Sequence, residues 1–354
     1  MAVYTAIDNP ELYFQVKAYA GTGSAHSQTF DGDEDMQPDL VWIKNRGSVT
    51  NHEVADSVRG VNLLLKPNDT DAEQSLATKI TAFNSDGFSV GTDQNVNESG
   101  VNQVAWCWKA GSAFSNDASA TSIGDIDSSG SASTTAGFSI CSYTGSGSAG
   151  DEIKHGLDKT PEMLIFKNRS TVVTWIVGSK PAGFTNIQFL QASDAATDDS
   201  NAFNDTDPTS SVFTLGGDAG TGTNETSSNF VCYAFASIQG YSKIGSYTGN
   251  GSTASPFIFL GFRPAFVLIR NVDSVEGWHI FDNKRDGYNA ENRRLYPHSD
   301  EAEANASQTI DMLSNGFKVR SSTEGLNKSG DTIIFAAFAE APFVNSNGVP
   351  CNAR

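Results

Sequence analysis

Short apolar runs separated by polar turns dominate the chain. Three of these runs each follow a proline, draw mainly on Val, Ile, Leu and Phe, and end in a basic residue and Asn. They extend from Pro38, Pro161 and Pro264 to Lys44-Asn45, Lys167-Asn168 and Arg270-Asn271. Runs this short, with turn residues on both sides, are typical of β-strands rather than helices. A proline that begins a strand removes no ladder hydrogen bond, so its position also fits a strand.

The same ordered pattern occurs three times. Each copy begins with Tyr and a Gly/Ser turn, and a second short run starts seven residues after the Asn, at His52, Trp175 or Trp278. Each copy ends in an Asn/Ser/Gly turn and a closing apolar run; the opening tyrosines are Tyr19, Tyr143 and Tyr247, and the closing runs are 104–108, 231–235 and 334–338. A repeat of about 100 residues is the size of a domain, not of a solenoid turn.

This repeat predicts an all-β chain of three tandem β-sandwich modules, jelly-roll or lectin-like, with short terminal arms. We expect a docking arm at 1–15, modules at 16–111, 137–239 and 240–343, and a tail at 344–354. The Ser/Gly-rich segment 112–136 is expected to be a linker, with a first strand of the second module at 122–126 as the alternative. Segments 72–80 and 301–307 are expected to be irregular loops, with a short helical turn in each as the alternative.

Charge and composition narrow the classes of partner. The formal net charge is −18 with a pI near 4.5, which disfavours nucleic acid and anionic membrane surfaces. The chain contains no apolar stretch long enough to span a bilayer, and its first residues lack a signal core, so we expect folding in a reducing cytoplasm. The four cysteines have no CxxC spacing; Cys107, Cys141 and Cys232 are expected to be small core residues, and Cys351 to be exposed.

Reactive residues form no catalytic motif. The five histidines occupy different positions in the three copies, and neither a GxSxG elbow nor an HExxH motif occurs. Carboxylates are plentiful but none has a distinctive setting, so a pair for glycosidic cleavage stays an alternative. We therefore predict that the protein is not an enzyme and has no cofactor.

One acidic loop invites comparison with calcium sites. Asp31-Gly-Asp-Glu-Asp35 alternates carboxylates, but the sixth position is Met36 and the twelfth is Trp42, so it does not match an EF-hand. The loops at 198–199 and 204–207 are similarly acidic. Solvated turns are the favoured interpretation and loop-bound Ca²⁺ is the alternative, so no metal site is predicted.

Charged residues recur at matching places in the copies. The pairs Asp56/Arg59 and Asp282/Arg285 have the same spacing, while the second copy has Ser179-Lys180 there. We expect ion pairs that fix a loop, with ligand contact as the alternative. The basic residues that end the runs are expected to bond neighbouring carbonyls; they are Lys44, Lys167 and Arg270.

Aromatic residues leave two interpretations open. Alternation in the closing run puts Trp106 and Trp108 on one face of a strand, with Ala105 and Cys107 on the other. Core packing is favoured, and an exposed ring beside Asn and Asp loops would instead form a sugar-stacking platform. The candidates for such a platform are Trp42, Trp175, Trp278 and Tyr288.

Several strings resemble a known family. They are GFSICSYTGSGS followed by HGL and PEMLIFKNRS, GFSVGTDQNVNESG followed by VAWCWKAG, the closing APFVNSNGVP and the opening YTAIDNPELYFQ. They resemble the repeated β-domains of tailed-phage structural proteins, common in marine phages and notably those of cyanobacteria, which are usually called tail-fibre-like or virion proteins. The resemblance covers nearly the whole chain. It implies a β-sandwich protein displayed on a phage particle, on a tail fibre, the baseplate periphery or the capsid surface.

The expected function is therefore that of a non-enzymatic, tail-fibre-like virion protein, made in the host cytoplasm, for assembly and adhesion to host-surface glycans. Capsid decoration on the head surface is the first alternative, and a glycan depolymerase is the second. The expected partners are other virion proteins, host glycan and further copies of the chain, without nucleic acid or membrane insertion. The arm residues expected to dock on the virion are Tyr4, Pro10, Tyr13 and Phe14.

Overall fold

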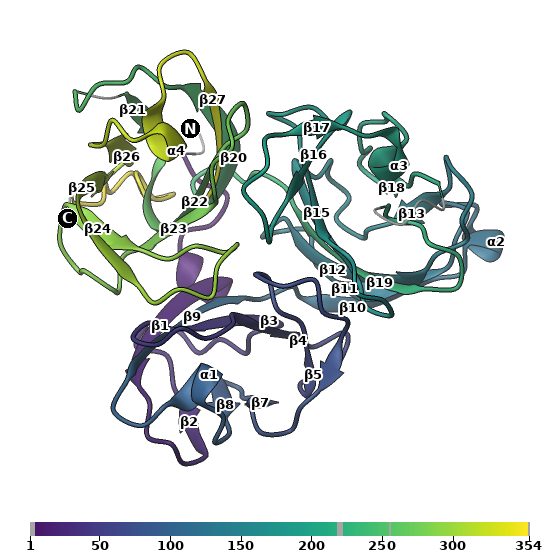
Figure 1. Ribbon diagram of the computed structural model, residues 1–354, viewed down its shortest axis with the longest axis horizontal. Coiled ribbons are helices and arrows are strands. Elements are labelled where there is room, and N and C mark those ends of the chain that lie inside the picture. The colour runs from purple at the N-terminus through teal and green to yellow at the C-terminus, as the bar shows by residue number, and fades with distance from the viewer. Residues whose placement is uncertain (1–3, 218–221, 255, 353–354) are drawn as a thin grey trace.

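The computed structural model describes residues 4–217, 222–254 and 256–352. It shows a chain made of antiparallel β-sheets, which confirms the all-β class. Three groups of strands surround a common centre (Figure 1), and we call them the first, second and third units. The described helices are single short turns, and none has the length and apolar character needed to cross a bilayer.

The first unit precedes residue 110. Its elements are η1 (Pro10–Leu12), β1 (Phe14–Ala20), β2 (His26–Gln28), β3 (Leu40–Asn45), β4 (Glu53–Asp56), β5 (Leu63–Leu64), β6 (Gln74–Ser75), β7 (Ile80–Phe83), β8 (Phe88–Val90), α1 (Gln94–Asn97) and β9 (Asn102–Trp108). The larger sheet has the order β1-β9-β3-β4 and a smaller sheet has the order β2-β8-β7. Two residues of the loop expected at 72–80 form β6, and its last residue begins β7.

The second unit contains the longest sheet. Its elements are β10 (Ser112–Asn116), α2 (Ala118–Thr121), β11 (Ser128–Ser133), β12 (Phe138–Thr144), β13 (Glu152–Lys154), β14 (Met163–Asn168), β15 (Trp175–Ser179), β16 (Asn186–Phe189), β17 (Thr197–Asp198), α3 (Ser200–Phe203), β18 (Val212–Thr214) and β19 (Asn229–Phe235). Eight strands pair in the order β10-β11-β12-β19-β14-β15-β16-β17, and β13 pairs with β18.

The third unit has two four-stranded sheets. Its elements are β20 (Ser242–Thr248), β21 (Phe257–Phe259), β22 (Phe262–Asn271), β23 (His279–Asp282), β24 (Glu291–Arg294), β25 (Ala304–Leu313), β26 (Gly316–Val319), α4 (Glu324–Asn327) and β27 (Thr332–Pro342). The sheet orders are β20-β27-β22-β23 and β21-β26-β25-β24. The prediction of a loop at 301–307 is wrong from residue 304 onward, because β25 begins there and pairs with β24 and β26.

One strand order recurs in the three units. In each, the strand that carries the opening Tyr pairs with the closing strand, and the closing strand pairs with the strand after the proline. That strand in turn pairs with the next strand along the chain. The three orders are β1-β9-β3-β4, β12-β19-β14-β15 and β20-β27-β22-β23. The repeated landmarks of the sequence therefore occupy matching places in three sheets.

The segment expected to be a linker is part of a sheet. Residues 112–133 supply β10 and β11, which extend the second unit's sheet beyond β12. The alternative strand at 122–126 is reduced to a single bridge between Ile126 and Ile153. Strand pairing uses backbone groups and needs no apolar side chain, which is why Ser/Gly-rich composition misleads here. Gly130 is required in β11, since a Cβ there would lie 2.0 Å from Ile140 O.

Both faces of the larger sheets are buried. Trp106 and Trp108 point into a core shared by the three units, whereas Ala105 and Cys107 point into the first unit's own core. The predicted alternation and the core-packing interpretation are confirmed for this strand. Burial on two faces explains why β3 is a continuous apolar run rather than an alternating one.

A buried asparagine organises the turn that follows the opening Tyr. In the first unit the Asn97 side chain donates to Ser24 O at 2.8 Å and accepts from Thr22 N at 2.7 Å, and Tyr19 Oη donates to Val96 O at 2.6 Å. The same contacts are made in the second unit by Asn224 with Ser146 and Ser148 and by Tyr143 with Thr223, and in the third by Asn327 with Asn250 and Ser252 and by Tyr247 with Leu326. The repeated Tyr and Asn thus hold one turn in each unit.

We expect Asn97→Ala to lower the free energy of unfolding by about 2–4 kcal/mol, because buried backbone groups lose their partners. Asn102 is exposed on β9, and Asn102→Ala is the matched control, with a change below about 0.5 kcal/mol. Urea unfolding followed by tryptophan fluorescence measures both. Equal losses in the two variants would contradict this role of Asn97.

Candidate binding surfaces

The candidate tryptophans are buried. Trp42, Trp175 and Trp278 are 6%, 1% and 0% exposed and lie where neighbouring units meet, at places that we call junctions. A sugar-stacking platform needs an exposed ring face, and these three rings do not offer one. The core-packing interpretation holds for them.

Two of these tryptophans link units by hydrogen bonds. Trp175 Nε1 in the second unit donates to Lys66 O in the first unit at 2.9 Å. Trp278 Nε1 in the third unit donates to Phe189 O in the second unit at 2.9 Å. Each indole therefore contributes apolar area to the shared core and satisfies a carbonyl of the preceding unit.

His52 holds the corresponding position in the first unit. Its Nδ1 accepts a hydrogen bond from Trp42 Nε1 at 2.9 Å, so the proton of the neutral ring is on Nε2. That Nε2 lies 3.1 Å from Tyr296 O of the third unit, to which it donates. The repeated His/Trp/Trp position thus supplies one donor to each of the three junctions.

The basic residues that end the post-proline strands are also buried at the junctions. Lys44 Nζ donates to Asn45 O at 2.8 Å and to Asp300 O of the third unit at 3.2 Å. Across the other junctions, Lys167 donates to Thr70 O at 3.2 Å, and Arg270 donates to Ala192 O at 2.8 Å and to Asp194 O. The predicted bonds to neighbouring carbonyls are confirmed.

These cationic groups are buried and bond to carbonyls rather than to a carboxylate, so burial lowers their pKa values. Desolvation lowers the pKa of Lys44 and Lys167 to about 8 and that of Arg270 to about 10. The three cationic groups bond to carbonyl oxygens of the neighbouring unit and so hold the loops of two units together.

An ion cluster crosses the junction between the first and second units. Arg59 pairs with Asp56 at 2.5 Å and with Glu73 at 2.8 Å, and all three side chains are largely buried. From the second unit, Arg169 pairs with Glu73 at 2.8 Å and Tyr233 Oη donates to Asp56 at 2.7 Å. Burial alone would raise the pKa of Glu73, but hydrogen bonds from the two guanidinium groups lower it from its ordinary value.

The junction between the third and first units repeats this cluster. Arg285 pairs with Asp282 at 2.6 Å and with Glu303 at 3.1 Å. From the first unit, Arg46 pairs with Glu303 at 2.9 Å and Trp106 Nε1 donates to Asp282 at 2.9 Å. The predicted ion pairs are confirmed at both places, and they join units in addition to fixing loops.

Uncharged side chains replace the cluster at the junction between the second and third units. Here Ser179, Ala196, Val272 and Ala336 stand in the places of the aspartate, glutamate, junction arginine and aromatic donor. The backbone register is the same, since Ala196 N donates to Val272 O at 2.8 Å as Glu73 N does to Arg169 O and Glu303 N does to Arg46 O. One junction of three therefore has uncharged residues at the position of the ion cluster.

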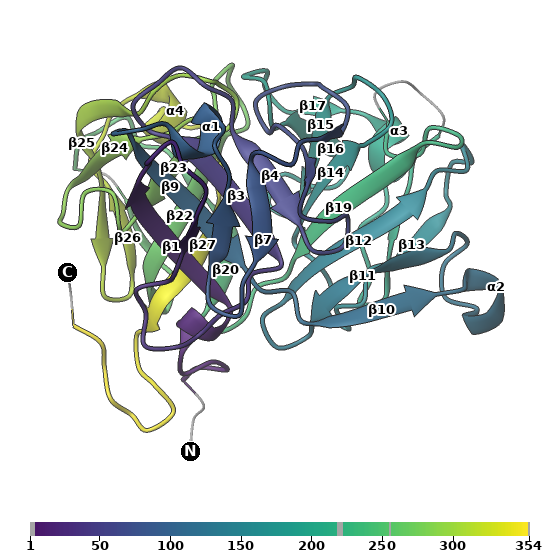
Figure 2. The ribbon, with the colours of Figure 1, turned by 90° about the horizontal axis from the view of Figure 1, so that it is seen from below.

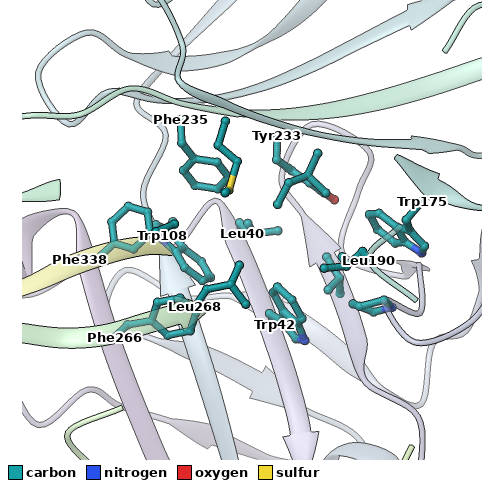
Figure 3. Close-up of a pocket in the computed structure, with 15 residues that line it drawn as sticks. Leu40, Trp42, Trp108, Trp175, Leu190, Tyr233, Phe235, Phe266, Leu268 and Phe338 are labelled. Carbon is teal, nitrogen blue, oxygen red and sulfur yellow. The ribbon is translucent and has the colours of Figure 1, made fainter. Parts of the chain in front are cut away.

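A small cavity lies at the centre of the three units (Figure 3). Its volume is about 30 Å³, and Trp108, Phe235 and Phe338 each line it from a different unit. Pockets that bind small molecules have volumes about ten times larger than this cavity or more, and polar groups in their walls orient the ligand. The cavity is thus a packing void and not a binding site.

The segment expected to be an N-terminal docking arm is mostly part of the fold. Pro10 is buried, Tyr13 is partly buried with its ring centre 6.1 Å from that of Tyr241, and Phe14 is 2% exposed. Only Tyr4 among the four arm residues is exposed, at 54%. The arm prediction is wrong for Pro10 and Phe14, because their side chains complete a core of this chain and are not accessible to another protein.

The segment before η1 contacts the segment after β27. Ser346 N donates to Asp8 Oδ1 at 2.7 Å, and Arg263 donates to Asn352 O at 2.8 Å. The yellow loop that follows β27 lies on the side of the molecule away from α1 and α4 (Figure 2). We call this side the terminal end.

The opposite side, which we call the loop end, carries three equivalent exposed valines. β1 and β3 both run antiparallel to β9, so the loop after β3 lies where β1 finishes, away from η1. In these loops Val49, Val172 and Val275 are 68%, 66% and 71% exposed. The sequence analysis missed them, although each stands four residues after the repeated Asn.

Exposed aromatic residues occur in the third unit. Of the candidate stacking residues Tyr288 is exposed, at 81%, and Phe257 and Phe259 of β21 are 45% and 54% exposed. Phe259 also lines a hollow of about 220 Å³ with Tyr4 and Phe343. The structure does not bring Tyr288 together with the three buried tryptophans.

In residues 4–217, 222–254 and 256–352, no group of three or more His, Cys, Asp or Glu is arranged for a metal ion. Asp31 of the acidic loop pairs with Lys17 at 2.5 Å. Cys107, Cys141 and Cys232 are buried as predicted, and burial raises the pKa of each thiol.

The ion cluster between the first and second units can be tested by a double-mutant cycle. Glu73→Ala removes the carboxylate that Arg59 and Arg169 share, so that Arg59 keeps only Asp56, and we expect it to lower the free energy of unfolding by about 3 kcal/mol. The double variant Glu73→Ala/Arg169→Val copies the Ala196/Val272 pair and should recover at least about 1 kcal/mol of that loss. Urea unfolding measures both, and additive losses would contradict coupling across the junction.

Acid should weaken the fold before its carboxylates titrate. Burial lowers the pKa of His155 and His298 to about 4, of His279 to about 3, and of His52 well below its ordinary value. The unfolded chain binds protons at these residues near pH 6.5 and the folded chain does not, so stability falls as pH drops below 6.5, by about 1.4 kcal/mol per pH unit for each histidine. His279→Asn should flatten the slope between pH 6.5 and 5 by that amount in urea titrations. An unchanged slope would contradict the assignment.

Comparison with known proteins places the chain in a family without assigning it an activity. No curated protein and no solved structure matches it. A family model described as "Domain of unknown function (DUF7483)" matches residues 9–342, which extend from the start of η1 to the end of β27. The chain therefore belongs to the DUF7483 family.

Proposed function

We propose that this protein is a non-enzymatic structural and adhesive protein of a tailed-phage particle, built from three tandem β-sandwich modules and tail-fibre-like in role. The sequence resemblance supports the particle. The observation that carries the adhesive role is the set of equivalent loops with exposed Val49, Val172 and Val275 at the loop end, opposite the contact between Asp8 and Ser346. Such a molecule would attach to the particle by its terminal end and present its loop end to the host surface.

The placement of the charged landmarks supports a structural role over a catalytic one. The recurring Asp, Arg, Lys and His residues are buried at the junctions and bond to each other or to backbone carbonyls. An active site needs such groups convergent on an accessible hollow. Here they hold three sheets in one arrangement.

Threefold repetition within one chain suits weak, multivalent adhesion. The Asn45 side chain accepts from Gly47 N and Ser48 N at 3.0 Å, and Asn168 and Asn271 accept from their own loops, so each loop has a defined shape. Three loops on a rigid body, multiplied by the copies on a particle, convert weak contacts with glycan into strong attachment.

Capsid decoration is the second candidate, favoured by one observation. The three units surround a common centre (Figure 1), and such a chain matches a threefold position of a capsid lattice. Copy number per particle separates the two, because decoration follows the capsid lattice and a tail location gives few copies. We propose the tail location first.

The loop end can be tested with the purified chain and the envelope polysaccharide of the host. Val49→Ser/Val172→Ser/Val275→Ser should weaken binding by about 10-fold or more, since the three contacts act together. Val349→Ser is the matched control, because Val349 is 58% exposed but belongs to the C-terminal tail, which bonds to Asp8 at the terminal end. Biolayer interferometry measures both.

Two further outcomes decide the proposal. Mass spectrometry of purified particles must detect the chain, and its absence would overturn the virion role. New reducing ends released from the polysaccharide would overturn the non-enzymatic role in favour of a depolymerase.

A further inference from the structure

The third unit has an open sheet edge at a place that the second unit covers. β20 is the first strand of its sheet, and among the described residues no strand pairs with its outer side. The equivalent strand of the second unit, β12, has β11 paired along its outer side from Phe138 to Tyr143. In the second unit, the edge that corresponds to β20 therefore accepts an antiparallel strand.

The open part of β20 can be located to the residue. Gly249 N donates to Asp331 O at 2.9 Å, and the alternation of an antiparallel ladder then directs Tyr247 toward β27 and Ser246 and Thr248 outward. Ser246 and Thr248 are exposed. Their N–H and C=O groups offer four hydrogen-bonding positions to an added strand.

Exposed aromatic side chains lie beside this edge. In the second unit, the strand β11 and the turn before it also cover β13, where Ser128 Oγ donates to Lys154 O at 3.0 Å and Ile126 bridges Ile153. β21 takes the place of β13 in the third unit, and its residues Phe257 and Phe259 are 45% and 54% exposed. The third unit thus exposes apolar area where the second unit has its additional strands.

The corresponding edge of the first unit is protected by charge. Lys17 in β1 pairs with Asp31 at 2.5 Å, and such charges discourage strand addition. In β20 the equivalent residue, two positions before the Tyr, is Gly245. The lysine of β20, Lys243, lies further from the Tyr and donates to Phe259 O at 2.7 Å, so residues 245–248 carry no charge where the equivalent segment of β1 carries Lys17.

We propose that a second copy of this chain occupies the edge, by antiparallel pairing of β20 with β20 about a twofold axis at Tyr247. Ser246 of each copy then bonds to Thr248 of the other, which uses all four outward positions. The free half of β20 is small and hydroxyl-bearing, as β11 is, so the strand has the composition that this edge accepts in the second unit.

Twofold pairing closes both edges at once and leaves none for further addition. It also joins two four-stranded sheets into one of eight, the number in the second unit's sheet, and brings the β21 phenylalanines of both copies to the new contact. This gives a surface to the homo-oligomer expected from the sequence. It stands independently of the virion role.

Sedimentation velocity of the full chain tests the proposal. We expect the chain to form a dimer at about 50 µM. Its dissociation constant should fall as the salt concentration rises from about 0.05 to about 0.3 M, because salt screens the repulsion between two acidic copies. Ser246→Pro removes an outward N–H without removing a bond to β27, and should raise the dissociation constant by about 10-fold or more. Ala18→Pro makes the same change in β1 and should leave the dissociation constant unchanged.

Phe257→Ser/Phe259→Ser is a second variant that leaves the β20 backbone intact, and it should also weaken the dimer. Circular dichroism confirms that each variant is folded. A wild-type chain that stays monomeric to about 0.5 mM in 0.3 M salt overturns the proposal. A dimer that persists in both variants, or that Ala18→Pro also disrupts, overturns it as well.

Discussion

The structure depends on burial of both faces of its three larger sheets. One face of each sheet packs on the unit's own smaller sheet, and the other packs on the neighbouring units, so that Trp108, Phe235 and Phe338 from three different units meet at the centre. A face this apolar has no stable exposed state. The units are therefore parts of one body, and the polar groups carried into their junctions must find partners there.

That requirement explains the repeated polar landmarks. The basic residue after each apolar run, and the His or Trp seven residues beyond the Asn, bond to carbonyls of the preceding unit. The opening Tyr and the late Asn hold a turn within their own unit. The repeated polar residues thus supply hydrogen-bond partners for groups that are buried where the units meet.

Local chemistry was predictable from the sequence, whereas the arrangement of the units was not. Strand positions, the Asp56/Arg59 pair and the carbonyl contacts of Lys44 follow from patterns within one copy. A continuous apolar run such as 40–43 indicates two buried faces, but it does not say that the second face is covered by another copy. For this reason Trp42 was a surface candidate, and Ser/Gly-rich composition concealed β11, whose pairing depends on its backbone.

The difference between the junctions makes their response to acid unequal. The first unit is joined on both sides through carboxylates, Glu73 toward the second unit and Glu303 toward the third, whereas the junction between the second and third units has Ala196 and Val272 at the matching positions. Strong acid protonates the carboxylates and leaves the apolar pair intact. Strong acid therefore weakens both junctions of the first unit and spares the contact between Ala196 and Val272, although the shared apolar core still holds the three units in one body.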